Sequence, residues 1–187
     1  MDRKFTLAHF GTVNKARNPE LLWKVLSELV EENNDFAGDL ELKFVGRLDN
    51  SAREAIQNYK LEQYLTKIDF LPHKEVLLKQ RQSQVLLLLI NQTHNAGGIL
   101  TGKFFEYLAA ERPILAIGPT KGDVADILAT AKAGVIVDFE DNALLKASIL
   151  DYYNKYKTSQ LFVNPAGIHS YSRYELTRKL AMVLDNL

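Results

Sequence analysis

The sequence predicts an α/β protein: a Rossmann-like, doubly wound parallel sheet of about six strands with helices on both faces. Segments with strand and helix patterns alternate about six times along the chain, which is typical of parallel sheets. The central strand candidate, Val85–Ile90, is apolar at every position, as expected of a strand buried on both faces. The 187 residues and 47% apolar content suffice for one core. We therefore predict a single domain over residues 1–187.

The strand candidates are short apolar runs bounded by Gly or Pro. In chain order we expect strands at Phe5–Phe10, Leu40–Gly46, Ile68–Leu71, Val85–Ile90, a segment that Pro113 opens, and Gly134–Val137.

The helix candidates begin at capping signals and carry apolar residues at helical spacing. We expect helices capped by Asn18, Ser51, Thr101 and Ser172, one over Lys74–Gln82, one from Gly122 or Asp123, and one over Asn142–Tyr156 with Leu144, Leu145, Ile149 and Tyr152 inward. The segment from Lys157 to His169, with Asn164, Pro165 and Gly167, predicts irregular structure. The terminal helix, residues 170–187, has an apolar face that includes Leu176, Leu180, Val183, Leu184 and Leu187.

Charge and cysteine content narrow the function classes. Lys and Arg together number 23, and Asp and Glu together also number 23, so the net charge is zero and would not attract nucleic acid. The chain has no Cys, which excludes disulfides and thiolate chemistry. No signal peptide precedes the first strand pattern, so we expect a cytoplasmic location. No D-x-D, P-loop or G-x-G-x-x-G motif and no metal-spaced His pair is present, so we expect no metal and no bound cofactor.

The stretch after the central strand has the features of a binding loop. Gly97, Gly98 and Gly102 allow close approach of a ligand to the backbone. The helix that follows offers its N-terminus to an anion at the carboxyl edge of the sheet. Lys103 would bind a phosphate and Glu106, one turn on, a sugar hydroxyl. The structural alternatives are a solvated helix lysine and a surface or capping carboxylate.

Other candidates lie where further strands end. Gly11 follows the first strand, and Arg47 follows the second, where it is placed either for a diphosphate or for a surface salt bridge. Lys15 and Arg17 lie in the first loop, and Lys15 is a weaker phosphate candidate. Exposed loop histidines with ordinary hydrogen bonds are the commoner case for His73 and His94.

The order of these motifs resembles the C-terminal, donor-binding half of GT-B glycosyltransferases, in particular glycosyltransferase family 4 (group 1). The passages that carry the resemblance are Gly11-Thr12 with Ala16–Leu22, Phe44–Arg47, Phe70–Val76, and Gly102–Ala110 followed by Pro113–Ala116. The resemblance implies transfer of a sugar from a nucleoside-diphosphate-sugar, most often a UDP-sugar, to a glycan or lipid-linked acceptor. The partner it implies is an N-terminal acceptor-binding domain, and the whole protein could associate peripherally with a membrane.

Two departures from the family pattern bear on this reading. Retaining members have two glutamates eight positions apart; Glu106 matches the second, but Gly98 stands where the first is expected. In the first loop, Ala16 replaces the glycine that usually follows the lysine matched by Lys15. The catalytic residues and the stereochemical outcome therefore stay open.

Two rival hypotheses remain: half of a nucleotide-sugar epimerase of the same architecture, and a non-catalytic Rossmann-like interaction module. The 187 residues have room for only one of the two halves that a GT-B enzyme needs. We therefore expect this chain to be part of a longer protein and to transfer no sugar alone.

Overall fold

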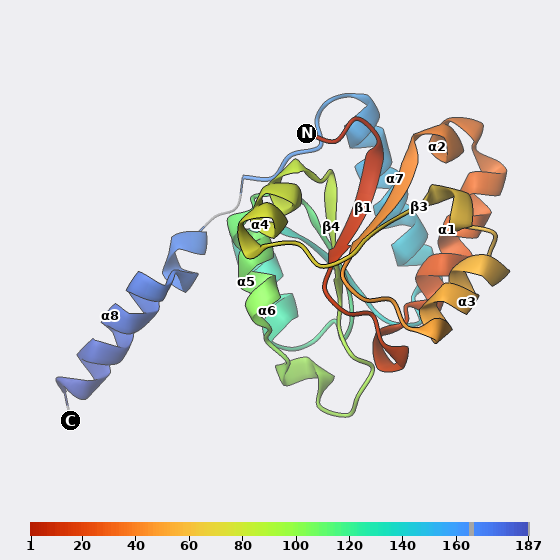
Figure 1. Ribbon diagram of the computed structural model, residues 1–187. Helices are drawn as coiled ribbons and strands as arrows, with labels where there is room; N and C mark the ends of the chain where they lie inside the picture. The colour runs from red at the N-terminus through yellow and green to blue at the C-terminus, as the bar shows by residue number, and fades with distance from the viewer. Residues whose placement is uncertain (165–166, 187) are drawn as a thin grey trace.

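The fold is a six-stranded, all-parallel sheet with helices on both faces, as the sequence predicted (Figure 1). The computed structural model describes residues 1–164 and 167–186. The strand order is β3-β2-β1-β4-β5-β6, so the direction of winding reverses between β1 and β4. The strands are β1 (Phe5–Phe10), β2 (Leu40–Val45), β3 (Leu65–Ile68), β4 (Val85–Leu89), β5 (Ile114–Ile117) and β6 (Gly134–Val137).

Burial of the strands follows their place in the sheet. Every residue of β1, β4 and β5 is buried, whereas β3 at one edge is half-buried throughout. The expected third strand at Ile68–Leu71 is wrong, because β3 pairs with β2 in a register that ends at Val45 and Ile68. Phe70 lies beyond that last pair with 87% of its surface exposed. An apolar residue just past an edge strand was mistaken for part of the strand.

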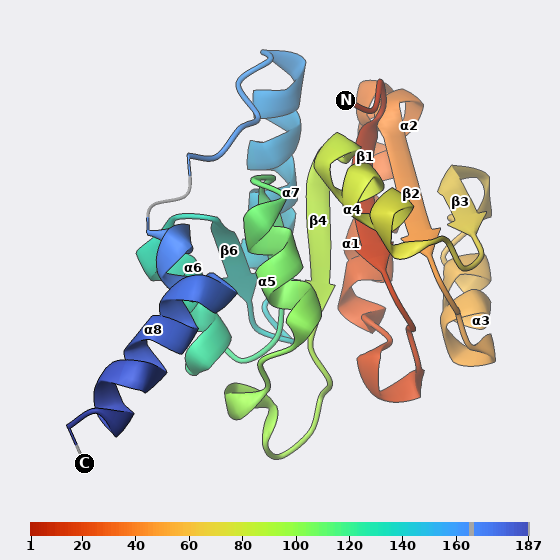
Figure 2. The same ribbon diagram turned by 60° about the vertical axis from the view of Figure 1, so that its left-hand side comes forward.

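Helices cover the two faces of the sheet in two groups (Figures 1 and 2). One group is α1 (Glu20–Glu32), α2 (Asn34–Asp39), α3 (Asn50–Asn58) and α7 (Asn142–Lys157), and the other is α4 (His73–Gln82), α5 (Gly102–Ala109) and α6 (Asp123–Ala131). Each group packs its buried side chains into a separate hydrophobic cluster, with Trp23 and Phe44 in one and Phe104 and Tyr107 in the other. Short 3-10 turns fill the loops: η1 (Lys15–Arg17), η2 (Glu62–Tyr64), η3 (Ala96–Gly98) and η4 (Ile168–Tyr171).

Local details of several helices differ from the expectations. The helix after β1 begins at Glu20 with Pro19 as its N-cap, because Asn18 instead accepts a hydrogen bond from the Trp23 indole at 2.8 Å. Asp49, not Ser51, caps α3 by accepting from the backbone N–H of Ala52. Leu144, expected inward, is 40% exposed, and α2 was not predicted.

The terminal helix α8 (Arg173–Leu184) projects away from the sheet (Figure 1). Ser172 caps it by accepting from the Glu175 N–H, as predicted. Its apolar face is exposed rather than packed, with Leu180 at 59% and Leu184 at 60%. Leu187 and Pro165, which entered the expectations for this region, lie outside the described residues. Among the helices within 1–164 and 167–186, none has the length and hydropathy needed to cross a membrane.

Candidate functional site

The reversal of strand order places two loops side by side at the carboxyl ends of β1 and β4. In doubly wound sheets this switch point is where ligands bind. Here hydrogen bonds join the two loops: the Gln92 N–H donates to the Ala16 carbonyl at 2.9 Å. The Arg17 Nε donates to the Asn91 Oδ1 at 2.8 Å, and its Nη1 donates to the Thr12 carbonyl at 3.3 Å. The guanidinium is thus held across the switch point.

Gly11 and Lys103, both expected in a binding site, meet at this point. Gly11 ends β1 with a φ of +122°, a conformation that favours glycine. A Cβ added at Gly11 would lie 2.8 Å from the Lys103 Nζ, so a side chain there would displace the ammonium. Lys103 comes from the first turn of α5, whose N-terminus points at the same edge of the sheet. Glycine at position 11 therefore leaves the space that the lysine head occupies.

The positive charge at this point is only weakly compensated. Burial, and then the nearby Arg17 guanidinium, lower the pKa of Lys103 from 10.5 to about 8, while Glu106 acts in the opposite direction. Among the described residues, no carboxylate oxygen lies within 4.0 Å of the Lys103 or Arg17 nitrogens. Two cations close together, partly desolvated and without a paired carboxylate, form a site suited to an anion.

Arg47 lies beside this site but is exposed. The Val13 N–H donates to the Arg47 carbonyl at 2.9 Å, which keeps the loop after β2 against the loop after β1. Gly46 makes this possible, because a Cβ there would meet the Gly11 carbonyl oxygen at 2.5 Å. The Arg47 side chain is exposed to solvent at this end of the sheet.

Glu106 faces the groove between α4 and α5. Its Oε2 accepts a hydrogen bond from the Gln80 Nε2 at 3.2 Å, and Gln80 is 1% exposed. A cavity of about 620 Å³ between α5, the start of α4 and the η4–α8 segment includes Gly102, Glu106 and His73 in its lining. Glu106 lies one turn after Lys103 in α5, and its charge raises the pKa of Lys103, the smallest of the three effects on that group.

Gly97 and Gly98 shape the path of the loop before α5. Both lie in η3, and the carbonyl oxygen of Gly97 stands 2.3 Å from where a Cβ of Gly122 would be. Gly97 therefore packs against the loop between β5 and α6. Gly98 is exposed, with open space beside its Cα. Among the described residues, neither glycine is recorded in contact with Lys103.

Of the weaker candidates, some are exposed, and the side chain of one joins the two loops. Lys15, His73 and His94 are all exposed. The sequence did not favour Arg17 over Lys15, yet the Arg17 side chain is the one that bonds across to Asn91, in the loop after β4. Its position depends on the η1 turn, which reverses the chain between Asn14 and Asn18. His9 was not predicted, because one histidine in an apolar strand carries no sequence signal of a site.

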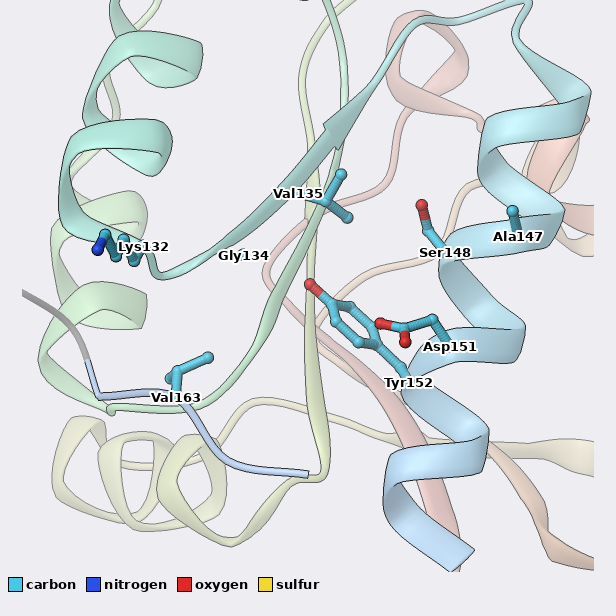
Figure 3. Close-up of a pocket in the computed structure, with 8 residues that line it drawn as sticks. All are labelled: Lys132, Gly134, Val135, Ala147, Ser148, Asp151, Tyr152 and Val163. Carbon is cyan, nitrogen blue, oxygen red and sulfur yellow. The ribbon is translucent and has the colours of Figure 1, made fainter. Parts of the chain in front are cut away.

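A second cavity, of about 480 Å³, lies between the start of β6 and α7 (Figure 3). Its lining includes Lys132 and Gly134 at the amino end of β6, and Asp151 and Tyr152 late in α7. The Tyr152 hydroxyl turns toward the strands and donates to the Ile114 carbonyl at 3.2 Å. This cavity is separated from the Gly11–Lys103 site by the length of the strands.

Comparisons with known proteins give structural neighbours only. No family model matches the sequence, and no curated protein matches it. A mutant of S. aureus TarM, solved in complex with fondaparinux, α-GlcNAc-glycerol and UDP, superposes with a TM-score of 0.65 at 16% identity over 85% of this chain. WaaG, a glycosyltransferase of lipopolysaccharide biosynthesis, gives a TM-score of 0.61 at 14% identity over 82% of the chain.

A third neighbour is the UDP-forming α,α-trehalose-phosphate synthase of Burkholderia vietnamiensis, with a TM-score of 0.62 at 12% identity over 98% of the chain. The chain spans 30%, 40% and 45% of the length of these three proteins, respectively. All three are GT-B glycosyltransferases. The resemblance expected from the sequence is thus confirmed at the level of the fold, which is that of one domain of such enzymes.

Proposed function

We propose that this chain is the donor-binding domain of a GT-B glycosyltransferase that transfers a sugar from a UDP-sugar to a glycan or lipid-linked acceptor. The observation that carries the proposal is the pair of poorly compensated cations, Lys103 and Arg17, at the carboxyl ends of β1 and β4. A nucleoside diphosphate is the anion that a switch point of this fold is shaped to receive.

Each residue then has a chemical role. Lys103, Arg17 and the N-terminus of α5 would bind the diphosphate and stabilise the negative charge that develops on it as the sugar leaves. Arg47 would contact the outer phosphate from the exposed side of the Gly11 loop. Glu106, held by Gln80, would accept hydrogen bonds from the ribose hydroxyls. The turn at Gly97 and Gly98 would border the sugar, and we assign no general base.

The comparisons support the nucleotide as well as the fold. One neighbour was solved with UDP, and another is described as UDP-forming. Because the chain spans less than half of each compared protein, the acceptor-binding domain is part of the proposal. Transfer requires both substrates to be held in one geometry, so we propose that the acceptor binds on that second domain.

Calorimetry tests the donor site directly. We expect saturable binding of UDP in the presence of EDTA, with weaker binding of uridine, GDP and ADP. Glu106→Gln should weaken UDP and uridine by the same factor of about two to five, because both ligands contain the ribose. The absence of heat from all three diphosphates at millimolar concentration would exclude a donor site here. A loss confined to UDP in the Glu106 variant would show that Glu106 does not bind the ribose.

A further inference from the structure

His9 is a buried titratable residue that the proposed function does not use. It lies near the end of β1 and its side chain has no exposed surface. Its Nδ1 is 2.9 Å from the carbonyl oxygen of Leu87 in β4. A carbonyl oxygen can only accept, so Nδ1 carries a proton and donates it. The imidazole therefore bridges the two strands that flank the switch point.

The second ring nitrogen faces the anion site. The His9 Nε2 is 3.3 Å from the Lys103 Nζ. If Nδ1 holds the only ring proton, Nε2 has a lone pair that can accept from the ammonium. The charges around His9 favour this neutral form. Burial first, and then the charge of Lys103, hold the pKa of His9 well below 6.5; the Leu87 carbonyl opposes this, Arg17 adds a smaller lowering effect, and the Thr12 carbonyl a still smaller opposing one.

The contact with His9 is the main interaction that fixes the position of the Lys103 ammonium. Within the part of the chain that the structure describes, His9 is the only side chain that forms a hydrogen bond with its Nζ. Gly11 forms the opposite wall and offers no side chain. An ammonium has three N–H donors, so one bond to His9 leaves two for a ligand. A flexible four-carbon stem would otherwise let the head group sample several positions.

We propose that His9 is a positioning residue: its Nε2 accepts from the Lys103 ammonium and fixes it over Gly11, with two N–H groups left to bind the donor diphosphate. This inference rests on the proposed function, because it assigns Lys103 to the diphosphate. His9 itself does not touch the ligand. A purely structural role, in which His9 only bridges β1 and β4 through the Leu87 carbonyl, would fix the same tautomer but would require no acceptor at Nε2.

Two substitutions separate the two ring nitrogens. The amide nitrogen of Asn in His9→Asn stands close to the position of Nδ1 and can still donate to Leu87, but no acceptor reaches Lys103. The longer side chain in His9→Gln places an amide oxygen near the position of Nε2, where it can accept from Lys103. We expect His9→Asn to weaken UDP about tenfold with uridine unchanged, and His9→Gln to retain UDP affinity within about threefold. Equal weakening of UDP and uridine in His9→Asn, or full UDP affinity in that variant, would overturn the proposal.

Measurements on the unsubstituted protein and on Lys103→Met keep the test independent of how the two His9 variants fold. Nitrogen-15 NMR of the histidine rings at pH 7 should show His9 neutral with its proton on Nδ1, and Lys103→Met should shift the Nε2 resonance. A proton on Nε2, or an imidazolium, would overturn the proposal even where UDP binds. Failure of the unsubstituted protein to bind UDP would instead overturn the proposed function, and with it the positioning role, whatever the tautomer.

Discussion

Two lysines, one buried and one half-buried, are compensated in different ways. Lys43 in β2 is 8% exposed, and its Nζ lies 2.5 Å from an Asp2 carboxylate oxygen and 3.9 Å from one of Glu41. Lys103 has a neutral imidazole as its hydrogen-bond partner and the Arg17 guanidinium as a charged neighbour. The first lysine is neutralised by the protein itself. The second has no carboxylate within ion-pair distance among the described residues, as the proposed role in binding an anion requires.

The largest expected effect concerns UDP affinity. Lys103→Ala should weaken UDP by about 10- to 100-fold, because a charge-assisted hydrogen bond is lost. Lys43→Ala should leave UDP affinity unchanged, since its charge is already paired. Calorimetry at pH 7 with both variants checks this contrast. Similar weakening in the two variants, or equal weakening of uridine by Lys103→Ala, would mean that Lys103 does not bind phosphate.

The same two lysines should change stability in opposite directions. The pKa of Lys103 in the folded protein, about 8, lies below its ordinary 10.5. At pH 7 the folded state therefore carries the full cost of burying that charge, and the cost decreases as the pH rises from 8 toward 10.5. Lys103→Met should raise the free energy of unfolding at pH 7 by roughly 1–3 kcal/mol.

Lys43→Met, in contrast, leaves Asp2 without its partner and should lower the free energy of unfolding by roughly 1–3 kcal/mol. Urea unfolding of the two variants at pH 7 and pH 10 measures both effects. The gain from Lys103→Met should be smaller at pH 10. A loss of stability in that variant would show that the Lys103 charge is satisfied within the fold.

The smallest expected effect is the pH dependence of UDP binding. If Lys103 binds the diphosphate as proposed, it does so in its protonated form, so affinity should stay nearly constant from pH 7 to about 8. Between pH 8 and pH 9 it should decrease by about fivefold as the free protein loses the proton. Lys103→Arg, whose guanidinium stays charged, is the matched control and should remove the decrease. A decrease of equal size in that variant would assign the titration to another group.

The strands and most helices could be predicted because their signals are local. Val85–Leu89 is a continuous apolar run, and Ser172 begins a capping pattern, so each segment indicates its own structure. Phe70 shows the limit of this reasoning, because only the register with β2 decides where an edge strand ends.

The candidate site could be predicted only in part. Lys103 was identified because glycines and a helix start surround it in the sequence. Arg17 and His9 were not, because their partners Asn91 and Leu87 are 74 and 78 positions away in the chain. The tertiary fold alone brings these residues together.

The hydrogen bonds that join the loops after β1 and β4 have a consequence for the energetics of recognition. Where a binding site consists of mobile loops, these loops become ordered when the ligand binds, and the lost conformational entropy reduces affinity. Here the Ala16–Gln92 and Arg17–Asn91 bonds have ordered the backbone already. Most of that entropic cost was therefore met when the chain folded. In the proposed function, the exposed side chain of Arg47 is one group that the ligand would still have to immobilise.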